Sequence, residues 1–156
     1  GYGMGFTLRA ALARLGPDAT VTVVELVPEI IEWARGPMQE VASGCLDDPR
    51  VRLVMADVAD AIAAGAGRYD AILLDVDNGP DGLVRLDNDR IYSPEGLRRA
   101  KAALRRGGVL AVWSAAKDPA FAARLRRAGF AVEEVQVRAR TNGKGPTHTI
   151  WFATPR

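Results

Sequence analysis

The sequence predicts an α/β fold built on a doubly wound, mostly parallel sheet. Apolar runs of strand length alternate along the chain with longer segments of helical period, which is typical of a parallel sheet covered by helices. A polar residue ends each apolar run. The last two runs are separated only by the short turn from Asn142 to Gly145, so we expect them to pair as a C-terminal antiparallel hairpin.

The expected elements follow from periodicity and from residues that begin or end helices. Pro28 begins a helix that Gly36-Pro37 should kink, Ser93 and Asp118 cap two later helices, and Gly107-Gly108 closes the first of those. We expect helices at residues 7–15, 28–41, 58–64, 93–105 and 118–128. We expect strands at residues 20–26, 51–55, 69–74, 109–113, 131–139 and 147–153, and irregular chain at 43–49 and 77–92.

The chain has 156 residues, which predicts a single domain over residues 1–156. A glycine-rich loop that opens a helix in such a sheet normally follows a strand, yet the chain begins inside this loop at Gly1. We therefore expect the first strand to lie upstream of residue 1, so that the domain is truncated at its N-terminus.

Composition excludes several classes of protein. With 48% apolar residues the chain can form a core, and its formal charge of +2 does not call for a nucleic-acid partner. Cys45 is the sole cysteine, which argues against a disulfide scaffold and favours the cytoplasm. No apolar run is long enough to cross a membrane. We expect no metal site, and we interpret the arginines after Pro94 and the sole histidine, His148, as structural.

Ligands of such sheets bind beyond the carboxyl ends of the strands, and the chain places candidate residues there. They are the turn Gly1-Tyr-Gly-Met-Gly5, Glu25, Asp57, Asp75 and Ser114. The glycines let a ligand approach the backbone, and an acidic residue about 20 positions later can accept hydrogen bonds from both ribose hydroxyls. The pattern therefore predicts a nucleoside-containing cofactor. We expect Glu25, at a strand end, to lie outside the core.

The glycine spacing distinguishes two cofactor classes. A dinucleotide site has the pattern G-x-G-x-x-G, but here Phe6 stands at the third glycine. The tighter G-x-G-x-G favours S-adenosylmethionine, and Asp57 followed by apolar Val58 suits an adenine ring. Structural readings stay open: the glycines could serve only a tight turn, Asp75 could cap a helix, and Asp77 and Asn78 are turn-forming types.

Several segments resemble the spermidine-synthase-like group of the class I methyltransferase fold, whose sheet is Rossmann-like. They are GYGMGFTLRAAL, VVELVPEII, MADVADAI, YDAILLDVDNGP and IYSPEGLRRAKAALRRGGVLAVWSA. The resemblance covers nearly the whole chain and implies S-adenosylmethionine or its decarboxylated form as donor. It implies donor contacts from Gly1, Gly3, Gly5, Glu25, Leu26, Asp57, Val58 and Asp75, catalytic roles for Asp75 and Asp77, and substrate contacts from Asn78 and Tyr92.

Departures from spermidine synthases bear on the reaction. Met4 stands where their glycine loop carries an aspartate, and Asn78 replaces the second acid of their D-x-x-D-P pattern. We therefore expect methyl transfer to a small amine or another nucleophile, with Asp75 orienting or deprotonating the acceptor. The alternatives are aminopropyl transfer, an NAD-dependent oxidoreductase and a non-catalytic nucleoside-binding module. The chain could also form a homo-oligomer.

Overall fold

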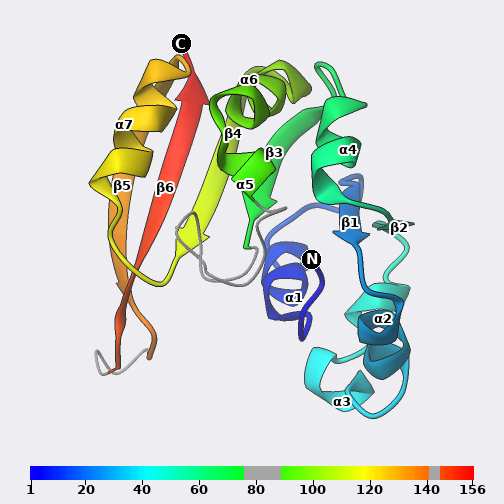
Figure 1. Cartoon of the computed structure of the whole chain (residues 1–156). Helices are drawn as coiled ribbons and strands as arrows, with labels where there is room; N and C mark the ends of the chain where they lie inside the picture. Colours follow the sequence, from blue (N-terminus) through cyan, green and yellow to red (C-terminus); the bar gives the residue numbers. More distant parts are fainter. Residues whose placement is uncertain (76–88, 141–144) are drawn as a thin grey trace. The chain divides into compact units, whose positions relative to one another are not determined.

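The computed structural model describes residues 1–75, 89–140 and 145–156, and it divides into two compact units, Gly1–Ala61 and Ile62–Arg156 (Figure 1). Its elements confirm an α/β fold with both parallel and antiparallel strand pairs.

The first unit contains a two-stranded parallel sheet flanked by short helices (Figure 1). In register, Val21 lies opposite Val51 and Glu25 lies opposite Met55, so both strands end at the same edge. Its elements are α1 (Phe6–Leu12), β1 (Val21–Glu25), α2 (Pro28–Arg35), α3 (Gln39–Ala42), the 3₁₀ turn η1 (Cys45–Asp47) and β2 (Val51–Met55); α4 (Val58–Ala63) crosses the boundary to the second unit.

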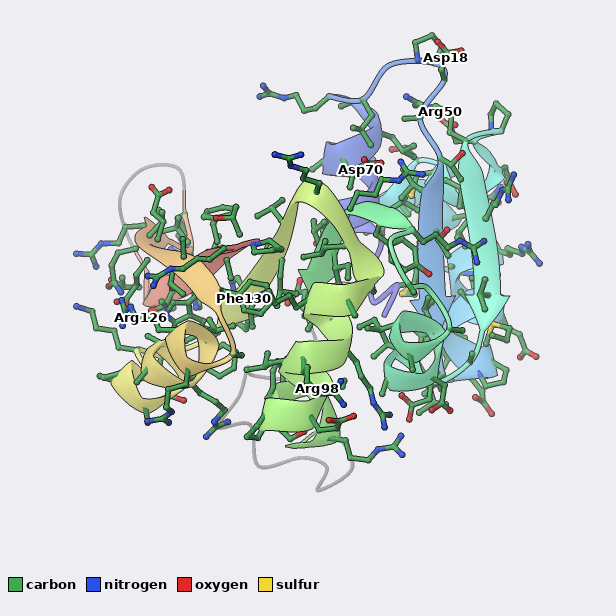
Figure 2. All side chains as sticks on the ribbon, turned by 90° about the horizontal axis from the view of Figure 1, so that it is seen from above. Asp18, Arg50, Asp70, Arg98, Arg126 and Phe130 are labelled. Atoms are coloured by element: carbon green, nitrogen blue, oxygen red, sulfur yellow. The ribbon has the colours of Figure 1, made fainter. Side chains whose placement is uncertain are left out.

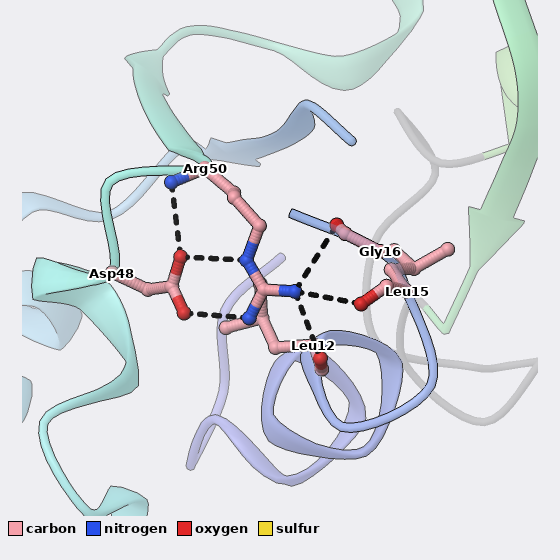
Figure 3. Close-up of polar contacts among 5 residues, drawn as sticks. All are labelled: Leu12, Leu15, Gly16, Asp48 and Arg50. Atoms are coloured by element: carbon pink, nitrogen blue, oxygen red, sulfur yellow. Dashed lines mark hydrogen bonds and ion pairs between the residues drawn. The ribbon is translucent and has the colours of Figure 1, made fainter. Parts of the chain in front are cut away.

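Arg50, directly before β2, forms an ion pair with Asp48 and hydrogen bonds with carbonyl groups at the end of α1 and just beyond it (Figure 3). The Arg50 guanidinium donates from Nε and Nη2 to the Asp48 carboxylate, at 2.9 and 2.7 Å. Its Nη1 donates to the carbonyl oxygens of Leu12, Leu15 and Gly16, at 3.1, 2.8 and 3.4 Å. One side chain thus satisfies carbonyls that a helix end leaves without intrahelical partners. We call these five residues the Arg50 clamp.

The second unit is a four-stranded mixed sheet with the order β3-β4-β6-β5. β3 and β4 are parallel, and β6 runs antiparallel to both of its neighbours. This arrangement confirms the predicted C-terminal hairpin; its turn at 141–144 lies outside the described residues. The elements are β3 (Tyr69–Leu74), α5 (Asp89–Tyr92), α6 (Pro94–Ala103), β4 (Leu104–Ser114), α7 (Pro119–Arg127), β5 (Phe130–Arg138) and β6 (Thr147–Pro155).

Helices α6 and α7 lie on the same face of this sheet, with Arg98 and Arg126 among their outward side chains (Figure 2). Both helices begin as predicted: Gly96 N donates to Ser93 Oγ at 3.0 Å, and Phe121 N donates to Asp118 Oδ1 at 2.8 Å. Between helices and sheet the core is fully buried. It contains Leu97, Leu110, Val112, Phe121, Leu125, Phe130 and Trp151.

Several predicted boundaries are wrong. The first helix ends at Leu12 rather than at residue 15, and the predicted kink is a break between α2 and α3. Helix α6 ends at Ala103, and the chain turns directly into β4 because Leu104 is extended and pairs with Tyr69. Gly108 belongs to this strand: a Cβ there would lie 3.1 Å from the Tyr69 carbonyl oxygen, so glycine serves close strand packing instead of closing a helix.

Candidate functional site

The glycine turn of the first unit is held from inside by Tyr2. Gly5 N donates to the Tyr2 carbonyl at 3.0 Å, and Gly3 and Gly5 take positive φ values of 56° and 77°. The Tyr2 ring is buried beneath the turn, and its hydroxyl forms a hydrogen bond with Cys45 Sγ at 3.6 Å. Burial, and to a lesser extent this hydrogen bond, raises the pKa of Tyr2. A Cβ at Gly3 would meet no atom of the described residues within 4 Å, so in the described part of the chain the space beside Gly3 is open.

Glu25 fastens this turn to the end of β1. Its Oε2 accepts from Tyr2 N at 2.6 Å, and its Oε1 accepts from Leu26 N and Val27 N, both at 2.9 Å. Only 6% of the residue is exposed, so the expectation that it lies outside the core is wrong. Burial by itself would raise the pKa of Glu25, but the N–H donors of Val27, Tyr2 and Leu26 hold the pKa below its usual value.

Asp57 lies two residues beyond β2, at the same edge as Glu25. The two strand ends are joined by a hydrogen bond from Ala56 N to the Glu25 carbonyl at 3.0 Å. The Asp57 carboxylate accepts from Ala59 N at 2.7 Å and so caps α4. Asp57 and Val58 are both half-buried. The structure therefore brings the glycine turn, Glu25 and Asp57 to one edge of the β1–β2 sheet.

Apolar side chains flank this edge. Met4, in the glycine turn, is 53% exposed, and Leu26, next to Glu25, is 52% exposed. Large exposed apolar groups beside backbone N–H groups and a carboxylate suit a ligand that combines an aromatic base with polar hydroxyls.

The second unit carries the remaining described candidates. Asp75 directly follows β3 and is exposed. Tyr92, a predicted substrate contact, is only 2% exposed and packs edge-on against Phe121 with ring centroids 5.5 Å apart. Its ring is therefore part of the core. Asp77 and Asn78 lie outside the described residues.

The described residues contain neither a candidate metal cluster nor a helix that could cross a membrane. Within 1–75, 89–140 and 145–156, no cluster of three or more His, Cys, Asp or Glu side chains could hold a metal ion. In the same ranges no helix is long and apolar enough to span a membrane.

The family of the chain follows from its match to a family model. The model of the spermine/spermidine synthase domain matches residues 3–155. The chain belongs to this family. Members of the family are transferases with the fold of S-adenosylmethionine-dependent enzymes.

Curated and structural relatives agree with this membership. The polyamine aminopropyltransferase of Mycobacterium tuberculosis is 34% identical over 152 residues, which are 92% of this chain and 28% of that protein. A spermidine synthase solved with the transition-state analogue AdoDATO matches with a TM-score of 0.73 and 21% identity, over 100% of this chain and 51% of that one. Human methyltransferase-like protein 13, solved with SAH, matches with a TM-score of 0.74 and 22% identity, over 100% of this chain and 69% of that one. The two structures show the shared fold, and the chain spans less than a third of the mycobacterial protein.

Sequence reasoning missed two supports of this spermine/spermidine synthase domain. Tyr2 and Cys45, which is 7% exposed, lie under the glycine turn, where Cys45 Sγ also donates to the Gly5 carbonyl at 3.8 Å. An aromatic residue between two glycines is a weak signal, and only the fold shows that Cys45 meets it. The role of Arg50 could not be predicted from the sequence either, because the carbonyl groups that it contacts lie more than 30 positions away.

Proposed function

We propose that the first unit binds the nucleoside part of a sulfonium donor at the edge formed by the glycine turn, Glu25 and Asp57. The Glu25 carboxylate has about four lone-pair positions, and three backbone N–H groups occupy three of them. The remaining position can accept one ribose hydroxyl without breaking an existing bond. Leu26 and Val58 supply apolar surface for adenine, and the open space beside Gly3 admits the aminoalkyl chain.

We propose aminopropyl transfer from decarboxylated S-adenosylmethionine to an amine as the reaction. The observation that carries this choice is the curated relative of Mycobacterium tuberculosis, named a polyamine aminopropyltransferase and 34% identical over 92% of the chain. It favours aminopropyl transfer over the methyl transfer preferred from sequence. An amine acceptor belongs to the same proposal.

Asp75 is the proposed proton acceptor. The amine nitrogen attacks the carbon next to the sulfonium, a C–N bond forms, and the C–S bond breaks with its electron pair passing to sulfur as a neutral thioether. The attacking amine arrives as an ammonium ion, so one proton must leave, and a carboxylate can hold the ammonium and take that proton. Asp75 is exposed and directly follows β3, where such a group can meet a ligand.

The test compares donors on the full-length protein by calorimetry and by product analysis. We expect decarboxylated S-adenosylmethionine to bind at least tenfold more tightly than NAD and to yield an aminopropylated amine. Asp75→Asn should leave donor affinity within a few-fold and lower turnover by roughly 10²-fold, as for a lost general base. Methylated product from S-adenosylmethionine, with none from the decarboxylated donor, would reverse the choice of reaction.

A further inference from the structure

The outer edge of β5, in the second unit, is long and regular. In the described part of the chain the sheet order is β3-β4-β6-β5, so β5 pairs with β6 on one side and with no strand on the other. Its register with β6 is unbroken over the whole strand, from Phe130 opposite Pro155 to Arg138 opposite Thr147. The strand contains no bulge, proline or lysine, which are the usual protections of an edge. Such an edge is a template for pairing with another strand.

Helix α7 accompanies only the first part of β5. Both elements have nine residues, which make about 13 Å of helix but about 30 Å of strand. The helix ends at Arg127, shortly before the strand begins at Phe130, and the C-terminal part of β5 extends beyond it (Figure 1). A second strand that pairs with residues 134–138 would therefore meet little of the helix.

The polar side chains of this C-terminal part lie on one face of the sheet. Glu134 lies opposite the fully buried Trp151, whose Nε1 donates to Glu134 Oε2 at 3.2 Å, so Glu134 is on the face that α7 covers. Because side chains alternate along a strand, Gln136 and Arg138 are on the same face. All three residues are exposed. The end of β5 thus presents an acid, an amide and a base in a row.

Two copies of this edge can pair as antiparallel strands about a two-fold axis perpendicular to the sheet. Opposed residues then belong to the same face, so their numbers differ by an even number of positions. An axis at Gln136 brings Glu134 opposite Arg138 of the partner subunit, once on each side of the axis. Among registers with at least five pairs within β5, only this one opposes unlike charges, whereas an axis at Glu133 or Glu134 opposes two carboxylates.

We propose that the outer edge of β5 is an interface with a second copy of this chain, in which the two edges pair antiparallel about an axis at Gln136. The two four-stranded sheets then continue as one. Two pairs of Glu134 with Arg138 flank the axis on the face of α7, and Val135 meets Val137 of the partner subunit on the other face. Cross-strand pairs of unlike charge and of β-branched side chains both stabilise antiparallel strands. This interface is independent of the reaction proposed above.

Disulfide crosslinking of the full-length protein tests the register. Directly opposed residues of antiparallel strands have Cα atoms about 4.5–5.5 Å apart, a separation that a disulfide can bridge. Gln136→Cys should therefore give a linked dimer on mild oxidation, because this residue faces its own copy at the axis. Glu133→Cys, also exposed on β5, is the matched control. Its two copies lie six positions apart along the strands, about 20 Å, and should stay unlinked.

Charge reversal tests the ion pairs, by sedimentation of the full-length protein at low salt. Arg138→Glu opposes two carboxylates on each side of the axis and should weaken dimerisation about tenfold or more. Combining it with Glu134→Arg exchanges the charges and should restore most of the affinity. Arg35→Glu makes the same change of charge at an exposed residue of α2 and should leave the affinity unchanged. Added salt should weaken the wild-type dimer, because the charges are exposed.

Together the two experiments distinguish a dimer at this edge from a contact elsewhere. Urea denaturation of each variant shows whether a change in association is a change in folding. If Arg138→Glu also lowers the denaturation midpoint, crosslinking at position 136 decides the question. A wild-type protein that stays monomeric at submillimolar concentrations overturns the proposal and leaves the edge to a strand of a different protein. A dimer that Gln136→Cys fails to link, or that a folded Arg138→Glu variant forms with unchanged affinity, also overturns it.

Discussion

Glu25 is a buried carboxylate whose lost hydration is replaced by the backbone around it. Its charge is retained at 6% exposure because three backbone N–H groups replace the water it has lost. Sequence position predicted an acid at this strand end, and the structure confirms its place. Its burial could not be read from sequence, because the donor from Tyr2 comes from a turn 23 residues away.

Replacing Glu25 by glutamine should destabilise the protein in a pH-dependent way. At neutral pH we expect a loss of about 1–3 kcal/mol, because an amide nitrogen then faces an N–H donor. The folded pKa of Glu25 lies below the usual 4.5, so its contribution is complete above that value and is lost as the pH falls through the folded pKa. Urea denaturation at neutral and acidic pH should show the gap between wild type and Glu25→Gln narrowing with acid. The exposed Glu29 gives a control, Glu29→Gln, that should show no such gap.

At the scale of elements, the glycine turn depends on two glycines for different reasons. At Gly5 an added Cβ would lie 2.5 Å from the Tyr2 hydroxyl, whereas at Gly3 it would enter open space. Both have positive φ, so alanine at either position costs roughly 1–2 kcal/mol in backbone strain.

Gly5→Ala should therefore lower the free energy of unfolding clearly more than Gly3→Ala does. Gly3→Ala should instead show its larger effect in donor affinity, because it fills the space proposed for the aminoalkyl chain. Denaturation and donor titration of both variants test this pair. Equal losses of stability would mean that Tyr2 moves aside and does not hold the turn.

The Arg50 clamp gives a second prediction for an element. Arg50→Gln removes donors to the end of α1 and to Asp48 together, so it should lower the melting temperature more than Asp48→Asn. Arg98→Gln, which removes a more exposed ion pair with Glu95, is the control and should hardly change it. The Arg50 guanidinium lowers the pKa of Asp48 to about 2, so the contribution of the Asp48–Arg50 ion pair to stability is present above pH 4 and is lost as the pH falls towards 2. A melting temperature unaffected by Arg50→Gln would show that α1 is held by its apolar face alone.

Elements were predicted well where a pattern is local and less well where a distant partner sets the boundary. The caps Ser93 and Asp118 act through residues three positions away, and the structure confirms them. Strand β4 begins five residues earlier than predicted because Leu104 pairs with Tyr69, a contact that periodicity does not contain.

At the scale of the whole molecule, the residues proposed for the donor, apart from Asp75, all lie in the first compact unit, Gly1–Ala61. Hydrogen exchange should therefore show donor protection in the glycine turn and at the N–H groups of Leu26 and Val27. Donor protection confined to β5 and β6 would contradict the assignment.

The fold class and family resemblance were visible in the whole sequence because alternating strands and helices, and the glycine and acid motifs, are properties of residue order. The choice between aminopropyl and methyl transfer could not be predicted from the sequence, because it depends on which group the donor carries. Asn78 and Asp77, on which that choice partly rested, lie outside the described residues.

The contact of Cys45 with Tyr2 and Gly5 gives the protein an internal probe. Cys45 is the sole cysteine and is 7% exposed, so we expect a thiol reagent to react with it faster when the glycine turn lifts from the tyrosine. Its rate of alkylation therefore measures how often the turn opens. A ligand that closes the turn will slow that reaction, whichever group the ligand goes on to transfer.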